Sequence, residues 1–238
     1  TPKNGYVKKL QARAYQQLED WEHLSIAISS IKKYKVMNAD EIEKIEVAAF
    51  TGMLKASIKQ VDGDKSEQIW KQLPKNLKRN AELAYLYVDY LHMHDKDDEA
   101  ESLIRSFLSD GWDDELALLY ADLNVSNSKK QLETAETWLH SHARNESLLL
   151  VLGKLSMKCE FWGKEKNYLE TSIGLQPLDE AYLVLAQLLD EKMDSPKDAQ
   201  KLYRLGLINS VGRNAENHLY TRHLKSEKHQ KPFLKMIQ

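Results

Sequence analysis

The sequence contains very little cysteine, glycine and proline. Cys159 is the only cysteine among 238 residues, so the chain cannot form an internal disulfide. Its nine glycines and five prolines are few for a strand-rich fold, which needs many turns. The composition therefore favours helices. A single cysteine fits a reducing compartment, although a periplasmic domain without disulfides would have the same composition.

Long apolar runs and an excess of positive charge are also missing. Leu148–Leu152 is typical of the apolar runs, which are far shorter than the ~20 residues of a membrane helix. The net charge of −2 offers no basic footprint for nucleic acid. The chain starts at Thr1 with no visible signal peptide. We therefore expect a processed chain or a piece of a longer one. A membrane anchor upstream of Thr1 remains an open alternative.

Apolar residues recur at i, i+3, i+4 and i+7 along most of the chain, which predicts amphipathic helices joined by short turns. Asp40 is the predicted cap of the third helix. Pro74 ends the short helix opened by Gly63-Asp64, because proline lacks the backbone donor that a helix needs. The predicted helices cover residues 6–18, 21–34, 40–57, 63–73, 81–93, 97–109, 115–123, 129–141, 147–158, 162–175, 179–192 and 196–210.

The apolar stripes also predict which side chains face the core in the first three helices. Trp138 is predicted to point inward from a later helix. The inward residues are Leu10, Ala14, Tyr15 and Leu18 in the first helix, Leu24, Ile28 and Ile31 in the second, and Ile42, Ile45, Ala49 and Met53 in the third.

A period of 34 residues connects the helices into repeats. Each repeat combines large apolar positions with a small residue, as at Gly153 and Ala199, that lets two helices approach closely. Glu165 and Val211 depart from the pattern. The pattern is clearest in two successive repeats. Its positions are occupied by Leu149, Leu152, Gly153, Leu169, Ser172 and Pro177 in the first of them, and by Leu183, Ala186, Ala199, Tyr203 and Gly206 in the next.

This pattern is that of the tetratricopeptide (TPR) repeat, and it predicts an all-α, TPR-like solenoid of about five to six helical hairpins. We expect divergent hairpins in residues 1–80, regular repeats in 81–211 and a basic tail, frayed or loosely helical, in 212–238. The alternative is a helical bundle without repeats.

Several segments of the sequence resemble those of one protein family. Residues Phe161–Glu170 read FWGKEKNYLE, similar to the LWGKARSYLE-type segment of the proteobacterial HemY family. Trp70–Pro74, followed by Leu77-Lys78, resembles that family's W-x-x-L-P-x-x-L-[RK] segment. The likeness extends over nearly the whole chain to about residue 210.

The resemblance implies a function that spacing alone does not. HemY-family proteins carry two N-terminal membrane helices and a C-terminal TPR region at the bacterial inner membrane, and are linked to a late step of protohaem IX biosynthesis as scaffolds. It implies that this chain is the soluble TPR part, on the cytoplasmic face with the periplasmic face still open, and that its partners include haem-biosynthetic enzymes. The flavin-dependent oxidase that shares the HemY name is excluded, because no two glycines here stand one residue apart.

A TPR solenoid presents the first helix of each hairpin to its concave groove. We expect this groove to hold a helix or an extended segment of another protein, the alternative being a solvated helix face. Val184 projects onto the same face. The predicted partner-binding residues are Glu82, Tyr85, Asp89, His92, Lys154, Met157, Lys158, Leu188, Glu191 and Lys192.

The sequence shows no catalytic apparatus and predicts no metal site and no resident cofactor. His92 and His94, like His140 and His142, are two residues apart and point to different faces of a helix, so one metal cannot readily take both. Cys159 lacks an evident partner base. Direct haem or porphyrin binding is the alternative function, with His92, His140 or Cys159 as conceivable axial ligands. An enzyme, such as a tetrapyrrole oxidase, is the least favoured reading.

Two further groups of side chains have more than one interpretation. The five tryptophans are expected to pack at hairpin turns and interfaces, while Trp112 is also a candidate to cap an exposed patch. The basic run Lys71, Lys75, Lys78 and Arg79 would suit anionic lipid headgroups or form a solvated face, and four charges are few for lipid recognition.

Overall fold

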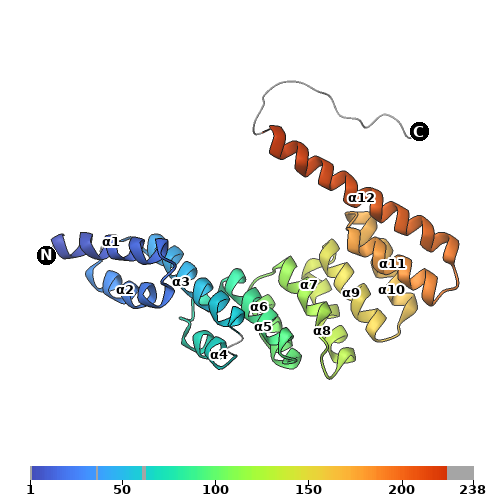
Figure 1. Cartoon of the computed structure of the whole chain (residues 1–238). Coiled ribbons are helices and arrows are strands. Elements are labelled where there is room, and N and C mark those ends of the chain that lie inside the picture. Colours follow the sequence, from blue (N-terminus) through green and yellow to red (C-terminus); the bar gives the residue numbers. More distant parts are fainter. Residues whose placement is uncertain (1, 36, 61–62, 224–238) are drawn as a thin grey trace. The chain divides into compact units, whose positions relative to one another are not determined.

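The computed structural model describes residues 2–35, 37–60 and 63–223, with side chains from 5 to 212 except around 36 and 61–63 (Figure 1). In these residues the regular elements are twelve α-helices and one short 3₁₀-helix, and they include no strand. This confirms the all-α, TPR-like fold. The chain divides into two compact units, Thr1–Ser126 and Asn127–Gln238.

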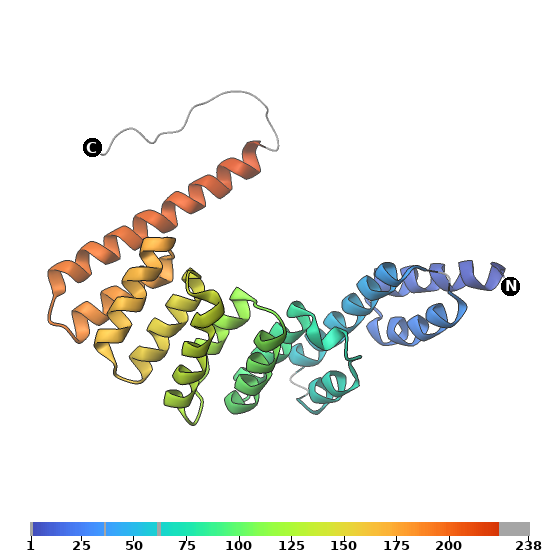
Figure 2. The ribbon, with the colours of Figure 1, turned by 180° about the vertical axis from the view of Figure 1, so that it is seen from behind.

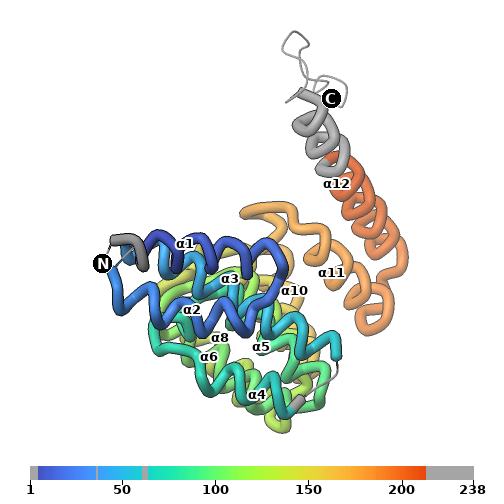
Figure 3. The backbone as a smooth tube through the Cα atoms, turned by 60° about the vertical axis from the view of Figure 1, so that its left-hand side comes forward, coloured from blue at the N-terminus to red at the C-terminus, as the bar shows by residue number. Residues whose placement is uncertain are grey.

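The first unit is built from successive helices joined by short turns, so that neighbours reverse direction (Figure 3). Each helix packs on the next along α1–α4 and along α5–α7, and α5 packs on both α3 and α4. Contacts between alternate helices, as between α3 and α5, are what stacked hairpins produce. The elements are α1 (Pro2–Gln17), α2 (Trp21–Tyr34), α3 (Ala39–Lys59), α4 (Gly63–Gln72), η1 (Leu77–Arg79), α5 (Ala81–Met93), α6 (Asp97–Asp110) and α7 (Asp114–Asp122).

The second unit continues the same scheme (Figure 2). Consecutive helices pack pairwise from α8 to α12, and α9 also contacts α11. The predicted hairpin of residues 115–123 and 129–141 consists of one helix from each unit, so it stays a prediction. The helices are α8 (Ser128–His142), α9 (Glu146–Lys158), α10 (Trp162–Leu175), α11 (Asp179–Glu191) and α12 (Pro196–His223).

Side-chain caps fix several helix starts. The third helix begins after Asn38, not at the predicted cap Asp40. Asn38 has an extended backbone, and its side-chain oxygen accepts the Glu41 N–H at 2.7 Å while the Glu41 carboxylate accepts the Asn38 N–H at 3.2 Å. This reciprocal capping box satisfies two donors that a helix start otherwise leaves unpaired, which is why it sets the boundary.

Charged residues, rather than glycines, form the tight turns inside several hairpins. Glu19, Asp95, Glu160 and Asp194 have φ between 47° and 61°, in the left-handed region that glycine adopts most easily. Each lies two or three residues after the end of the first helix of a pair. Glu160 and Asp194 are 34 residues apart, so the repeat period seen in the sequence is also a period of backbone conformation. These turns explain how so helical a chain manages with few glycines.

The N-terminal core corrects one predicted face. Leu24, Ile28 and Ile31 are buried as predicted and pack with Ala49, with Ile42 and Ile45 partly buried against them. However, Leu10 in α1 is 45% exposed, Leu18 just after α1 is 75% exposed, and Ala14 is also exposed. Ala12 is the residue that enters the core, beside half-buried Tyr15. Ala12 ends at Cβ and so allows α1 to approach α2 closely, which rotates the longer apolar side chains outward.

The last helix is longer than predicted. It runs to His223 rather than to residue 210, and residues 211–223 contain no proline that would interrupt it. Residues 224–238 of the predicted basic tail lie outside the described residues. None of the described helices combines the length and apolarity that a membrane span requires.

Gly153 allows α9 and α10 to approach each other closely in the second unit. A Cβ placed on Gly153 would lie 2.6 Å from Leu169 Cδ2 and 2.7 Å from its Cγ. Leu169 is fully buried, so its side chain has little room to move. The predicted role of Gly153 as a close-approach residue is therefore confirmed.

Glu165 stands where the repeat expects a small residue, and it is completely buried. Neither of its carboxylate oxygens has a hydrogen-bond partner within the described part of the chain. Burial alone raises the pKa of Glu165 from 4.5 to about 7. The second unit is therefore most stable when the Glu165 carboxyl group is protonated.

We predict that Gly153→Ala destabilises the second unit by up to about 2 kcal/mol. Overpacking against Leu169 costs about 1–3 kcal/mol, and the better helix propensity of alanine offsets about 1 kcal/mol of it. Gly174→Ala is the matched control, because no atom lies within 4 Å of its added Cβ. It should stabilise by up to about 1 kcal/mol. Urea unfolding, monitored by hydrogen exchange in α9 and α10, measures the change in free energy of unfolding for each substitution. Equal effects of the two substitutions would contradict the packing role.

We also predict that the second unit loses stability between about pH 4.5 and pH 7. The folded pKa of about 7 exceeds the ordinary 4.5, so in this window the native state holds a proton that the unfolded state has released. The loss is at most about 3 kcal/mol and is complete above pH 7. In Glu165→Gln the loss should disappear, while Glu170→Gln, an exposed site on the same helix, should keep it. The same unfolding assay at several pH values checks this, and an unchanged pH profile in Glu165→Gln would refute it.

Candidate functional site

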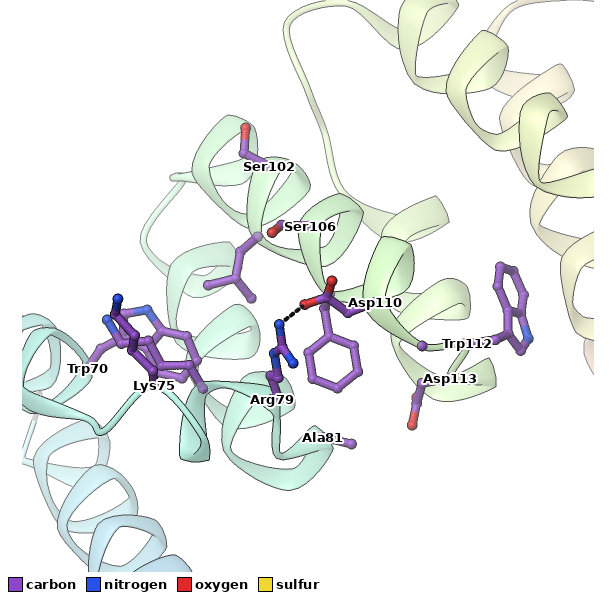
Figure 4. Close-up of a pocket in the computed structure, with 13 residues that line it drawn as sticks. Trp70, Lys75, Arg79, Ala81, Ser102, Ser106, Asp110, Trp112 and Asp113 are labelled. Carbon is purple, nitrogen blue, oxygen red and sulfur yellow. Dashed lines mark ion pairs between the residues drawn. The ribbon is translucent and has the colours of Figure 1, made fainter.

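An open cleft of about 780 Å³ lies in the first unit (Figure 4). Such a volume is within the range of sites that bind small molecules or peptide side chains. The lining comes from the end of α4, the segment containing η1, the start of α5, one face of α6 and the turn before α7. The lining residues are Trp70, Lys75, Lys78, Arg79, Ala81, Ser102, Leu103, Ser106, Phe107, Asp110, Gly111, Trp112 and Asp113.

Pro74 determines how the basic residues reach the cleft. It follows the end of α4, and its carbonyl accepts the N–H groups of Leu77 and Lys78 at 3.0 and 3.2 Å, which closes the turn into η1. Leu77 is fully buried and anchors this turn. Lys75 and Arg79 therefore remain exposed, with Lys78 half-buried beside them.

The floor of the cleft is the outer face of α6. Ser102, Leu103, Ser106, Phe107 and Asp110 follow the spacing that places side chains on one side of a helix. Their opposite side, carried by Ala100, Ile104 and Leu108, is buried in the core. Half-buried Leu103 and Phe107 thus form an apolar strip, and the exposed serines beside it offer hydroxyl groups.

Charge is distributed unevenly along the cleft. Arg79 Nη2 lies 3.2 Å from Asp110 Oδ2, and in Figure 4 this pair lies between the Trp70 end and the Trp112 end. Both side chains are more than half exposed, so the pair contributes about 0–1 kcal/mol to stability. Asp113 is occupied as the cap of α7, accepting the Leu116 N–H at 2.9 Å. Lys75 and Lys78 have no carboxylate partner among the described residues, so the Trp70 end is positive.

Trp70 is held in place by an aromatic stack. Its ring lies 4.5 Å from that of Tyr87 with the planes 9° apart, and Tyr87 in turn stacks on Tyr90 at 5.6 Å. Burial raises the pKa of Tyr87 to about 12, so its phenol stays neutral. Lys78 Nζ lies 6.0 Å from the Trp70 ring centroid, at the outer limit of a cation–π contact. The indole is therefore fixed before any ligand arrives.

The predicted groove residues of α5 lie outside the cleft. Glu82 and Tyr85 are exposed, and Glu82 lies 3.7 Å from Lys55 Nζ in a weak ion pair. Asp89 is half-buried. His92 Nδ1 contacts Asp97 Oδ1 at 2.7 Å, so this histidine is already engaged.

The remaining predicted groove residues belong to the second unit. Lys154 pairs with Glu180 at 2.6 Å, and Lys192 Nζ lies 5.5 Å from the Trp162 ring. Lys158 and Glu191 are exposed and Met157 is half-buried.

Leu188 needs correction as a partner-binding residue. It is fully buried, and Val184 on the same stripe is only 7% exposed. Because α11 packs against α9, α10 and α12, this stripe belongs to the core rather than to an exposed groove surface.

The described residues contain no cluster of three or more His, Cys, Asp or Glu side chains that would hold a metal. His94 Nδ1 lies 2.8 Å from the Tyr90 carbonyl oxygen, and His140 Nδ1 lies 3.0 Å from that of Thr137. Burial raises the pKa of the Cys159 thiol, which disfavours the reactive thiolate.

The sequence indicated part of the cleft. Of the basic run, Lys71 pairs with Glu67 at 3.3 Å outside the cleft, while Lys75, Lys78 and Arg79 line it. The sequence-based prediction does not include the α6 strip. Leu103 and Phe107 nevertheless lie off the stripe of Ala100, Ile104 and Leu108 and are spaced as a second apolar face. Trp112 lines the cleft, and its Nε1 donates to Asp114 Oδ1 at 2.8 Å. Trp138, predicted inward, is half-buried.

Comparison with protein-family models matches no family, and no curated protein matches the chain. Among solved structures, one similar chain comes from the crystal structure of MamA protein. The match has 14% sequence identity and a TM-score of 0.48, and it covers 78% of this chain and 98% of that one. Another comes from the crystal structure of the APC/C hetero-tetramer Cut9–Hcn1, at 14% identity, covering 85% of this chain and 45% of that one with a TM-score of 0.47. Both TM-scores are below 0.5, so neither match supports an inference about function.

Proposed function

We propose that this chain is a non-catalytic protein-binding module. The observation that carries the proposal is the α6 cleft, in which a fixed tryptophan, an apolar strip and two lysines without carboxylate partners face solvent together. Apolar surface with adjacent unpaired charge is typical of sites that recognise peptide segments. The stacked helices provide a rigid support for such a site.

The perturbed ionisable groups argue for binding rather than catalysis. Glu165 is buried within the second unit and is not one of the residues that line the cleft. The raised pKa of Cys159 makes it a poor nucleophile. Catalysis usually brings a perturbed group together with a partner base or charge in a concave site, and the cleft lining includes no histidine or cysteine.

The resemblance to the HemY family supports a narrower version of this proposal. In that version the chain is the TPR part of a scaffold on the cytoplasmic face of the bacterial inner membrane, where it recruits enzymes of a late step of protohaem IX biosynthesis. Part of the resemblance lies in Trp70–Pro74 and Leu77-Lys78, and of these residues Trp70 and Lys78 line the positive end of the cleft.

Direct haem or porphyrin binding is the second candidate, favoured by the aromatic and basic lining and by the volume of the cleft. Porphyrin carboxylates would pair with Lys75 and Lys78, but no lining residue offers an axial ligand to haem iron.

We predict covalent adducts with proteins when a photoreactive residue replaces Ser106 in the longest natural form of the chain in its own cells. The same residue at Ser109, exposed on α6 but outside the cleft, is the control. Mass spectrometry of the adducts identifies the partners, and haem-biosynthetic enzymes among them would support the narrower version. Equal labelling at the two positions, or none, would contradict the proposed function.

We further predict no shift of the Soret band when haem is titrated into the protein. The cleft supplies no iron ligand, and the histidines described above are engaged in contacts of their own. A saturable shift that Lys75→Glu/Lys78→Glu abolishes would replace the protein-binding proposal with the second candidate.

A further inference from the structure

We infer that the α6 cleft takes an acidic peptide segment that carries one large apolar side chain. This inference rests on the proposed function and names the chemistry of the partner. It is drawn from three features of the cleft: its positive end, its apolar strip and its length.

The positive end selects for carboxylates. Lys75 and Lys78 lie next to Trp70 without carboxylate partners among the described residues, so a peptide carboxylate that reaches them breaks no existing ion pair. Arg79, in contrast, already contacts Asp110. The lysines are partly exposed, so they steer association and set specificity more than they add affinity.

The apolar strip supplies the anchor. Trp70, Leu103 and Phe107 are all partly buried, and Trp70 is already stacked on Tyr87. An aromatic or aliphatic side chain placed against them would be desolvated on several sides at little conformational cost to the protein. Binding energy in protein interfaces concentrates at such sites.

The length of the strip sets the size of the segment. Ser102 and Asp110 are eight residues apart on α6, which corresponds to about 12 Å along the helix axis. Two helical turns or about four extended residues of a partner cover that distance. Ser102 and Ser106 lie beside the strip, where their hydroxyl groups can hydrogen-bond to peptide backbone.

The same cleft is poorly suited to a membrane surface. Its three cationic side chains are opposed by the carboxylates of Asp110 and Asp113, which leaves one net positive charge. Recognition of anionic lipid usually needs a cluster of about 4–8 lysines and arginines. A short peptide can place its carboxylates at the lysines and avoid Asp110, whereas a flat anionic surface meets both ends.

The test is selection of random peptides of about twelve residues, displayed on phage, against the full chain. Enriched peptides should be net acidic with at least one Phe, Trp, Leu or Met. Fluorescence anisotropy of the best peptides should show at least tenfold weaker binding to Lys75→Glu/Lys78→Glu. It should show a similar loss with Ser106→Trp, which fills the cleft from an exposed position without removing core packing.

Two matched variants separate the cleft from general effects. Lys33→Glu/Lys59→Glu changes the net charge equally at exposed sites of the same unit, and Ser109→Trp adds the same bulk to α6 outside the cleft. Both should bind within twofold of the unmodified chain. Circular dichroism of each variant confirms that it is folded.

Several outcomes would overturn the inference. These are no enrichment, enrichment without an acidic bias, or binding that is insensitive to the cleft variants. Lysine-dependent sedimentation with phosphatidylglycerol vesicles in the absence of selected peptides would assign the cleft to a membrane instead. Peptides that bind the chain elsewhere would leave the proposed function standing while the inference fails.

Discussion

The contact between α9 and α10 at Gly153 shows the constraint on which this structure depends. An amphipathic helix cannot cover its own apolar face, so each helix here depends on its neighbours. At Gly153 the absence of a side chain is what lets α10 approach α9. The small side chain of Ala12 does the same for α1 and α2. Where Glu165 occupies a small-residue position, the cost appears as a buried carboxyl group whose pKa is raised to about 7.

The cleft also follows from the way the helices pack. The core uses one stripe of α6, that of Ala100, Ile104 and Leu108, and leaves a second apolar stripe on the outside. Pro74 then turns the chain so that charged side chains reach that stripe while Leu77 is buried. The residues that form this cleft therefore also keep the roles that they have in the fold. Its charged members are the exposed side of a turn that the fold requires in any case.

Helix positions and the repeat period could be predicted from the sequence, because both follow from the local spacing of apolar residues. The start of α5 at Ala81 and the repeat marked by Gly153 illustrate this. The orientation of α1 could not, because Leu10 and Ala12 are both apolar and only the neighbouring helix decides between them. Leu188 was misassigned for a related reason: a first helix that packs on three others leaves less of its surface to a groove. The cleft was missed because its halves, residues 70–81 and 102–113, are separated in sequence and meet only after folding. The kinship with HemY stays a prediction, since it rests on short words of sequence.

The left-handed turns at Glu19, Asp95, Glu160 and Asp194 have one more consequence. A residue with a side chain gives up about 1 kcal/mol or more in that conformation relative to glycine. The chain accepts this at several places that contribute neither to its core nor to its cleft. It therefore holds a reserve of stability at its hairpin tips, which evolution or design can release without disturbing what the protein binds.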